Sequence, residues 1–296
     1  MKLPTFLVVG IEKSGTTSIY QYLNQHPQVY MSPVKETNFL ERDWENFQGK
    51  PNPKRIDTWE KYCNLFNDVQ DEIPIGEVSP NYLFHYQSSS ERIIKYVPDV
   101  KMIAILRNPV DRAYSDYLMH LRDSINVEKV RSLTEQVKFR ADTSFTLKKG
   151  LYSTPVKYYF DTFGKERLKI YLYDDLSKDA LEMMQDMYQF IGVDSNFSPD
   201  TSKRQQVAAV PKNQSLNNLI KTKNPIRGVV SSVLKVVIPL EMRQKLRSGL
   251  INLNSGGKEL KPLSSEERKI LSDFYREDIL KLQDLIQRDL SAWLGD

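Results

Sequence analysis

Short runs of apolar residues, each followed by a polar or glycine-containing stretch, are the main pattern along this chain. The runs at residues 6–9 and 101–106 are rich in valine, isoleucine and leucine. Apolar runs of this length are typical of strands that are buried on both faces, as in a parallel sheet. Shorter runs at 29–31, 73–78 and 168–173 have the same character. The pattern predicts strands that alternate with helices.

Apolar positions spaced three or four residues apart predict the helices. We expect helices directly after the first strand, from about residue 58, and over 150–163, 177–191 and 262–294. The last of these opens with Ser264 and Glu267, which fit a capping box. The charged segment 123–150 predicts a surface helix and a loop. No repeat is present in the sequence, so we expect a single α/β domain over residues 1–296, with a central parallel β-sheet flanked by helices.

Glycines, a lysine and hydroxyl residues lie between the first strand and the first helix. This stretch is Gly10-Ile11-Glu12-Lys13-Ser14-Gly15-Thr16-Thr17-Ser18. Gly10 and Gly15 let the backbone turn tightly and approach an anion, while Lys13 and the helix N-terminus supply positive charge. A glycine turn between strand and helix also occurs in plain α/β packing. The lysine together with the hydroxyls favours a phosphate-binding loop.

The spacing of this loop differs from that of an ordinary nucleotide-binding loop. The Walker A pattern G-x-x-x-x-G-K-[ST] has lysine directly after the second glycine, whereas this chain has Thr16 there. Its lysine, Lys13, comes two residues before that glycine. This argues against an ATP or GTP site in which lysine reaches the β- and γ-phosphates, although a kinase-like phosphotransferase remains the alternative.

A second strand-to-helix junction carries an arginine. Arg107 follows the apolar run 101–106, and Asn108 and Pro109 then fit the N-cap and first position of a helix. Ser115 lies about two turns into that helix. A planar guanidinium can bind two phosphate oxygens at once, and ligands of open α/β sheets bind at the carboxyl ends of strands. A surface ion pair is the plain alternative for Arg107.

Both junctions resemble motifs of the sulfotransferases that use 3′-phosphoadenosine 5′-phosphosulfate (PAPS). The first resembles their 5′-phosphosulfate loop, and the second resembles their 3′-phosphate motif R-[ND]-P-x-x-R-x-x-S-x-[YW]. The resemblance implies a fold related to that of the P-loop nucleotide kinases. It also implies that PAPS is bound by Lys13, Ser14, Gly15, Thr16, Thr17, Ser18, Arg107 and Ser115.

Two further segments resemble the carbohydrate and heparan-sulfate branch of this family. Lys35-Glu36-Thr37-Asn38-Phe39-Leu40 is similar to K-E-x-[NH]-F-[FL], which implies that Glu36 is the catalytic base. An exposed Lys–Glu pair is the plain alternative. Glu77 lies in a segment similar to G-E-x-[ST]-P-x-Y, but Val78 stands where heparan-sulfate enzymes often have lysine. We expect Glu77 to orient a substrate or to cap a turn.

The region 200–260 is basic and weakly periodic. By resemblance it is a loop and lid that covers the cofactor and substrate. One of Lys203, Arg204 and Lys212 is expected to complete the cofactor site, and we select Lys212. The apolar stretch 226–240 fits either a core helix or a lid that contacts a lipid-linked acceptor.

Composition narrows the class of protein. The chain has 296 residues, 40% hydrophobic and 27% charged, with a net charge of +4. This mild positive charge suits an anionic cofactor and does not call for nucleic acid as a partner. Cys63 is the one cysteine, so thiolate metal clusters and intramolecular disulfides are excluded. The histidines, His26, His85 and His120, are scattered, so we expect no metal site.

These observations predict a PAPS-dependent sulfotransferase, with Glu36 and Lys13 as catalytic residues. The expected acceptor is a hydroxyl or amine of a carbohydrate or glycoconjugate; a lipid or polyketide hydroxyl is the alternative. A nucleotide-binding protein without catalysis would not need Glu36. The first strand begins within about five residues of the start, which leads us to expect no signal peptide or anchor. Because the eukaryotic carbohydrate sulfotransferases that it resembles are usually membrane-anchored in the Golgi, we expect a bacterial, cytoplasmic member of the family, with a trimmed catalytic domain as the alternative.

Overall fold

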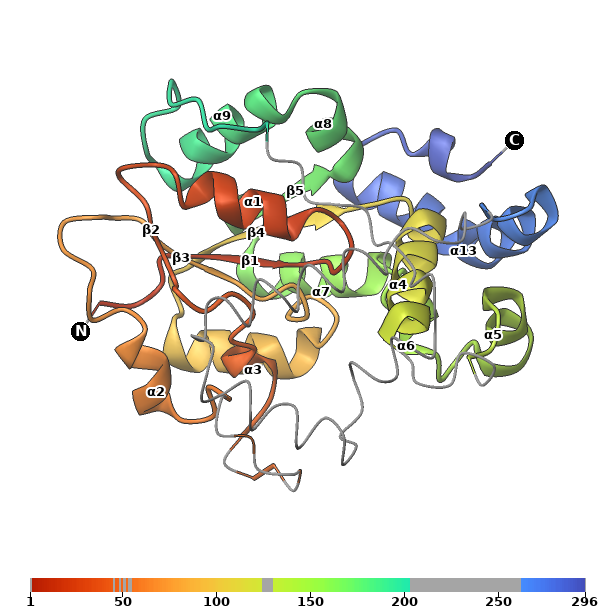
Figure 1. Cartoon of the computed structure of the whole chain (residues 1–296), viewed down its shortest axis with the longest axis horizontal. Coiled ribbons are helices and arrows are strands. Elements are labelled where there is room, and N and C mark those ends of the chain that lie inside the picture. Colours follow the sequence, from red (N-terminus) through yellow and green to blue (C-terminus); the bar gives the residue numbers. More distant parts are fainter. Residues whose placement is uncertain are drawn as a thin grey trace, which may run out of the picture.

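A parallel β-sheet forms the centre of the molecule. The computed structural model of the chain describes residues 2–44, 46, 47, 49, 52, 55–123, 130–202 and 262–295 (Figure 1). Within these residues the sheet has five strands in the order β2-β3-β1-β4-β5, all parallel. The strands are β1 (Phe6–Gly10), β2 (Tyr30–Met31), β3 (Ile75–Val78), β4 (Lys101–Leu106) and β5 (Leu168–Leu172). Each overlaps an apolar run, which confirms the predicted α/β fold.

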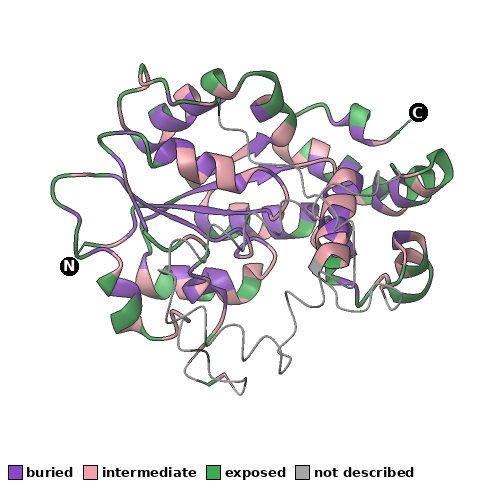
Figure 2. Cartoon of the chain, in the orientation of Figure 1, coloured by how far each residue is buried: buried purple, intermediate pink, exposed green. Residues whose placement is uncertain are grey.

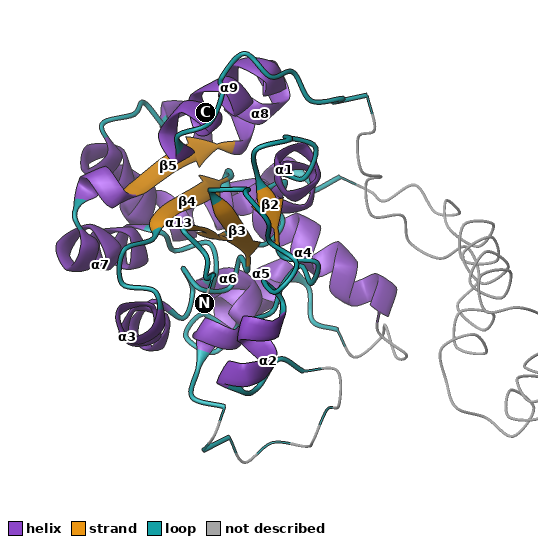
Figure 3. Cartoon of the chain, turned by 90° about the vertical axis from the view of Figure 1, so that its left-hand side faces the viewer, coloured by secondary structure: helices purple, strands orange, loops and turns teal. Residues whose placement is uncertain are grey.

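Helices cover both faces of the sheet (Figure 3). One face carries α1 (Thr16–Leu23), α8 (Tyr173–Lys178) and α9 (Ala180–Ile191). The other carries α2 (Trp59–Asn64), α3 (Tyr86–Tyr96), α4 (Pro109–Asp123), α6 (Phe145–Lys148), α7 (Ser153–Phe163) and α13 (Ser265–Ile286). A further helix, α5 (Leu133–Arg140), packs against α4 and α13.

The central strand β1 contributes to both layers of the core. Phe6 and Val8 pack with α1, α8 and α9, whereas Leu7 and Val9 pack into the opposite layer, because successive side chains of a strand point to opposite faces. All four side chains are fully buried, and the burial of this strand is evident in Figure 2. Burial of each such side chain stabilises the folded state by about 1.5–3 kcal/mol. Two-sided burial explains why the run is continuously apolar rather than alternating.

The order of the strands has a switch point between β1 and β4. The connection from the carboxyl end of β1 leads to β2 at one edge of the sheet, whereas the connection from β4 leads to β5 at the other edge. The two strands are neighbours, with Val8 paired to Ile103. Diverging connections of this kind leave a ligand-binding crevice outside the carboxyl ends of the strands. Both predicted phosphate motifs follow these two strands.

The helix expected over 177–191 is two helices. Asp179 interrupts it with an extended backbone, and its carboxylate accepts a hydrogen bond from the Glu182 amide at 2.9 Å, which caps α9. The preceding helix, α8, already begins at Tyr173, directly after β5. The single-helix prediction was wrong because Asp179 satisfies an N-terminal amide better than it continues a helix.

The last helix begins as predicted and ends early. Ser264 and Glu267 form the expected capping box at the start of α13. The helix ends at Ile286, because Gln287 adopts a left-handed conformation (φ 54°), and a 3-10 turn, η4 (Ser291–Trp293), follows. The predicted continuation to residue 294 was therefore wrong. The buried face of α13 packs against α4, α5 and α7.

Several predictions concern residues that the structure does not describe. Lys203, Arg204, Lys212 and the stretch 226–240 lie outside the described residues, as does almost all of the expected loop and lid. Among the described residues, no helix has the length and apolar character needed to cross a membrane.

Candidate active site

The loop between β1 and α1 has the geometry of an anion-binding turn. Gly15 is the N-cap of α1 and is left-handed (φ 86°), and its carbonyl accepts hydrogen bonds from the amides of Ser18 and Ile19. A Cβ atom on Gly15 would lie 2.7 Å from Leu176 Cδ2, so α8 approaches too closely for a side chain here. The first two amides of α1, those of Thr16 and Thr17, have no acceptor within the helix, and together with its dipole they attract an anion.

Ser14 is the clearest sign of a ligand in this loop. Its side chain is fully buried, and its hydroxyl has no hydrogen-bond partner among the described residues. A buried hydroxyl left without a partner costs about 1–3 kcal/mol. Because this hydroxyl belongs to the loop at the N-terminus of α1, an anion bound there would satisfy it.

Lys13 is half-buried beside α4. Its ammonium lies 3.6 Å from the Met119 sulfur. Burial lowers the pKa of Lys13 below its ordinary value, and the negative charge of Asp116 partly opposes this. A cation that is partly desolvated attracts an incoming anion more strongly than one in water. Lys13 therefore has the position and charge to bind a phosphate or sulfonate oxygen.

Arg107 joins the two predicted motifs. Its guanidinium donates a hydrogen bond from Nη1 to the Lys13 carbonyl at 3.1 Å. It also lies over the Tyr173 ring, 4.6 Å from the ring centre, and its own carbonyl accepts from the Tyr152 hydroxyl at 2.9 Å. These contacts hold the arginine at the crevice. The two strand-to-helix junctions therefore lie in contact with each other.

Sequence reasoning gave Tyr173 no role in the site. The residue opens α8 directly after β5, and its ring also lies against the position of Gly15. Because β5 ends at the same edge of the sheet as β4, the first residue after β5 is brought near Arg107. That place at a strand's carboxyl end was the signal available in the sequence.

Ser115 and Arg112 lie on α4, which begins as expected. The Asn108 side chain accepts a hydrogen bond from the Val110 amide at 2.9 Å. Ser115 is four residues before Met119, so both share the helix face that contacts Lys13. Arg112 forms an ion pair along the helix, with Asp116 at 3.7 Å, and its side chain is fully buried.

Glu36 lies at the same edge of the sheet, one strand from the loop. Its amide donates to the Val78 carbonyl at 2.8 Å, at the carboxyl end of β3, and β3 pairs directly with β1. Its carboxylate is 41% exposed and forms an ion pair with Lys35. The structure thus shows the exposed pair that was the plain alternative, at a place open to an acceptor.

Glu77 does not reach a substrate. Its side chain is fully buried beneath the segment that carries Glu36. The expectation that it orients a substrate directly was wrong, because the β3 position that carries it faces the core. The alternative, a role in holding a turn, agrees with its contacts.

Glu12 links the phosphate loop to more distant parts of the chain. It accepts a hydrogen bond from the Asn81 side chain at 3.0 Å and forms an ion pair with Lys149. Asn81 follows β3 and Lys149 precedes α7, so the loop is tied to both. No local pattern in the sequence indicates this ion pair, since Glu12 and Lys149 are 137 positions apart.

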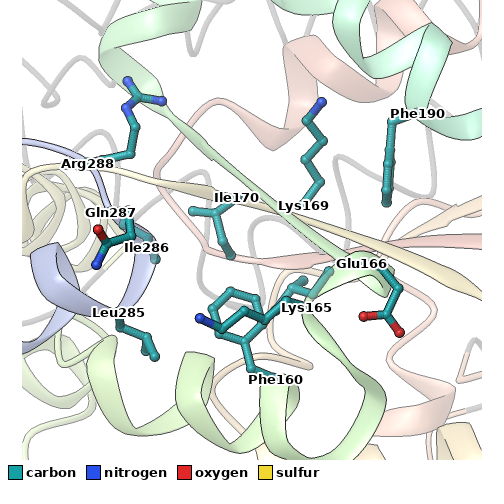
Figure 4. A pocket seen from close by; sticks show the side chains of 11 residues that line it. Phe160, Lys165, Glu166, Lys169, Ile170, Phe190, Leu285, Ile286, Gln287 and Arg288 are labelled. Atoms are coloured by element: carbon teal, nitrogen blue, oxygen red, sulfur yellow. The ribbon is translucent and has the colours of Figure 1, made fainter.

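An open hollow lies elsewhere, along the edge strand β5 (Figure 4). Phe160, Ile170 and Leu285 contribute apolar surface to it, and the side chains of Lys165 and Arg288 also line it. None of the predicted site residues is among those that line it. The crevice at β1 and β4 is therefore the candidate site.

The chain is similar in sequence to characterised proteins. A model of the sulfotransferase domain family matches residues 3–261. The bifunctional heparan sulfate N-deacetylase/N-sulfotransferase 4 of Mus musculus is 26% identical over 306 residues, covering 99% of this chain and 31% of that protein. The corresponding protein 3 of Homo sapiens is 25% identical, with 99% and 31% covered. The chain thus spans about a third of the length of these relatives.

The chain is also similar to a protein of known structure. The crystal structure of a sulfotransferase from Alicyclobacillus acidocaldarius is 28% identical and superposes with a TM-score of 0.69. The similarity covers 99% of each chain. The two proteins therefore share the same overall fold.

Proposed function

Since this chain belongs to the sulfotransferase domain family, we propose that it transfers a sulfonate group from PAPS to a hydroxyl or amine of an acceptor. The observation that carries the proposal is the convergence of Lys13, Arg107 and the partnerless Ser14 hydroxyl at the N-terminus of α1. Two cations and an unsatisfied donor at one helix N-terminus suit a ligand with several anionic groups.

The residues present fit the two ends of PAPS. Lys13, Ser14 and the first amides of α1 would hold the 5′-phosphosulfate, together with Thr16, Thr17 and Ser18. Arg107 and Ser115 would hold the 3′-phosphate. Lys212 stays a prediction, because it lies outside the described residues. When bound, PAPS supplies the sulfonate group and leaves as 3′-phosphoadenosine 5′-phosphate (PAP).

The reaction requires proton removal from the acceptor and stabilisation of negative charge on the leaving group. The oxygen or nitrogen of the acceptor would attack the sulfur of PAPS, and the bond from sulfur to the bridging oxygen would break. Glu36 would accept the proton that the acceptor atom loses. Lys13 and the loop amides would stabilise the charge that develops on that oxygen. The exposure of Glu36 leaves its carboxylate accessible to an acceptor.

We propose a carbohydrate or glycoconjugate as the acceptor. The support is the sequence similarity to enzymes whose names specify heparan sulfate N-sulfotransferase activity. An acceptor screen would begin with glycans that carry hydroxyl and amino groups. Turnover with lipid or polyketide hydroxyls alone would replace this proposal. A cytoplasmic location stays a prediction from the sequence.

Thermal stability in the presence of nucleotides tests the donor. A ligand that binds only the folded state stabilises it by about 2.7 kcal/mol at a hundred times its Kd. We expect PAP to raise the melting temperature and 5′-AMP, which lacks the 3′-phosphate, to raise it much less. Stabilisation by ATP with magnesium alone would overturn the proposal in favour of a kinase-like phosphotransferase.

The Glu36→Gln variant tests the base. Glutamine keeps the size of the side chain but cannot accept the proton, so we expect turnover to fall by about 10²–10⁴-fold while PAP binding is unchanged. Turnover equal to that of the wild type would rule out Glu36 as the base. Lys35→Gln is the matched control, since it removes the ion-pair partner and keeps the carboxylate.

A further inference from the structure

A carboxylate with unusual surroundings lies beneath the Glu36 segment. Glu77 is fully buried, and its oxygens accept hydrogen bonds from hydroxyl groups. The donors are Thr37 (2.5 Å), Ser79 (2.6 Å) and Tyr82 (2.7 Å) to Oε1, and Tyr62 (2.5 Å) to Oε2. An ionised carboxylate can accept about four hydrogen bonds, and four hydroxyl donors surround Glu77.

Three of these hydroxyls also accept a hydrogen bond from the backbone. The amides of three consecutive residues, Asn38, Phe39 and Leu40, donate to Ser79 Oγ, Thr37 Oγ1 and the Tyr82 hydroxyl, at 3.1, 3.2 and 3.1 Å. Each of these three hydroxyls therefore donates a hydrogen bond to Glu77 and accepts one from an amide of the segment. Tyr62 is the exception, because no amide of the described residues donates to its hydroxyl.

The direction of every hydrogen bond in this network depends on the charge of Glu77. A carboxylate accepts only, so each hydroxyl must point its hydrogen at Glu77 and its lone pairs at an amide. Burial and the charge of Glu77 raise the pKa of both Tyr62 and Tyr82 well above the ordinary value, so both phenols stay protonated and donate. Glutamine in place of Glu77 has an NH2 group that donates, so at least one of these hydroxyls would have to rotate and accept a hydrogen bond from it.

The segment that the network holds has a backbone that needs support. Glu36 and Asn38 both have positive φ angles, 63° and 51°. Side chains rarely tolerate this left-handed region, and it persists only where the surroundings determine it. Asn38 is the N-cap of a short 3-10 turn, η1 (Phe39–Glu41), and the hydroxyls accept hydrogen bonds from its amide and from the first two amides of the turn.

We propose that Glu77 is a positioning residue, which uses three hydroxyl groups to hold residues 38–40 and thereby sets the place of Glu36 at the carboxyl end of β3. The inference rests on the proposed function of Glu36 as the base. Loss of the network lets the segment relax and moves the carboxylate of Glu36 away from the acceptor.

Two tyrosines provide a matched test. Tyr82→Phe and Tyr62→Phe each remove one buried hydroxyl that donates to Glu77. Only the Tyr82 hydroxyl also accepts a hydrogen bond from an amide of the segment, that of Leu40. Both side chains are fully buried, so the two changes cost similar packing. Glu77→Gln is the direct variant, and the tyrosine pair decides the question where that variant fails to fold.

Amide hydrogen exchange and steady-state kinetics are the two measurements. For Tyr82→Phe we expect exchange of residues 36–40 to become at least about tenfold faster, and kcat to fall by about 10–10²-fold with the KM for PAPS unchanged. For Tyr62→Phe we expect a similar fall in melting temperature, with kcat within about twofold of the wild type.

Equal rates of amide exchange at residues 36–40 in the two variants, or equal kcat values, would overturn the positioning role of Glu77. The exchange measurement needs no turnover, so it decides whether the network holds the segment even where the wild type shows no sulfotransferase activity. An inactive wild type would overturn the proposed function instead. If Tyr82→Phe keeps the kcat of the wild type while amide exchange at residues 36–40 is faster, the network holds the segment but is not needed for catalysis.

Discussion

At the scale of single residues, the phosphate loop contains groups whose environments become favourable only when an anion binds. The Ser14 hydroxyl is buried and has no partner in the part of the chain that the structure describes, and Lys13 is partly desolvated. Each costs stability in the protein alone and contributes affinity when a phosphate is present. Opposite effects on stability and on binding are therefore the mark of these residues, and they can be measured separately.

Ser14→Ala should raise stability and lower affinity. Removing a partnerless hydroxyl is expected to stabilise the protein by up to about 1 kcal/mol, whereas losing a hydrogen bond to a charged ligand costs about 1.5–3 kcal/mol of binding. Urea melts and calorimetric titration with PAP measure the two effects. Ser89→Ala, which removes a partnerless buried hydroxyl from α3, should leave affinity unchanged. Unchanged PAP affinity in Ser14→Ala would exclude the hydroxyl from the site.

The lowered pKa of Lys13 predicts how PAP binding depends on pH. The lysine must be protonated to bind phosphate, so above its pKa in the free protein each pH unit is expected to weaken binding about tenfold. Because burial lowers that pKa from 10.5, the loss should begin below the ordinary lysine range. Titrations at increasing alkaline pH test this. Lys13→Arg should flatten the dependence, since a guanidinium stays protonated; an equally steep decline in that variant would assign it to another group.

At the scale of elements, helix α8 limits the space beside Gly15 in the phosphate loop. Its residues Tyr173 and Leu176 lie against Gly15, and Tyr173 also stacks on Arg107. The helix starts directly after β5, earlier than its sequence pattern predicts. The early start brings an aromatic ring to the crevice, so the boundary of one helix decides part of the site.

Gly15→Ala should therefore be far more harmful than a similar change elsewhere. Gly192 has nearly the same left-handed backbone (φ 89°), but no atom lies within 4 Å of a Cβ added there. Gly192→Ala is expected to cost about 1–2 kcal/mol for its backbone alone. Gly15→Ala adds a 2.7 Å contact with Leu176, so its melting temperature should be lower and PAP binding should be lost. Equal stability of the two variants would show that α8 adjusts without cost.

At the scale of the whole molecule, the C-terminal helix supports the site through a chain of contacts. Asp278 on α13 accepts from the Tyr152 amide at 2.6 Å and from the Ser153 hydroxyl at 2.5 Å, at the start of α7. The Tyr152 hydroxyl in turn donates to the Arg107 carbonyl, and Arg107 donates to the carbonyl of Lys13. Residues far apart in sequence thus form one connected structure.

Asp278→Ala should weaken PAP binding although Asp278 is not part of the crevice. The change leaves the Tyr152 and Ser153 donors without their acceptor, at about 1–3 kcal/mol of stability, and loosens the support of Arg107. Melting curves and PAP titrations of the folded variant measure both effects. Asp273→Ala, on the same helix but exposed and paired with Lys269, should change neither. Unchanged PAP affinity in Asp278→Ala would show that α7 holds Arg107 without α13.

The sequence alone was sufficient for the strands, their parallel arrangement and the two junctions at which Lys13 and Arg107 lie. Apolar runs of a length suited to two-sided burial predict such strands, and the residues after them then share one edge of the sheet. Local signals also predicted the Asn108 cap and the Ser264 capping box, because caps depend on neighbouring residues only. These features need no knowledge of distant contacts.

Only the tertiary structure decided the roles of buried polar groups. Glu77 and Arg112 are charged residues that a sequence reader places near a surface, yet both are fully buried. The hydroxyls that satisfy Glu77 come from α2, from the segment before η1 and from residues that follow β3. A buried charge is tolerated only when such partners converge on it, and which residues converge depends on how the whole chain packs.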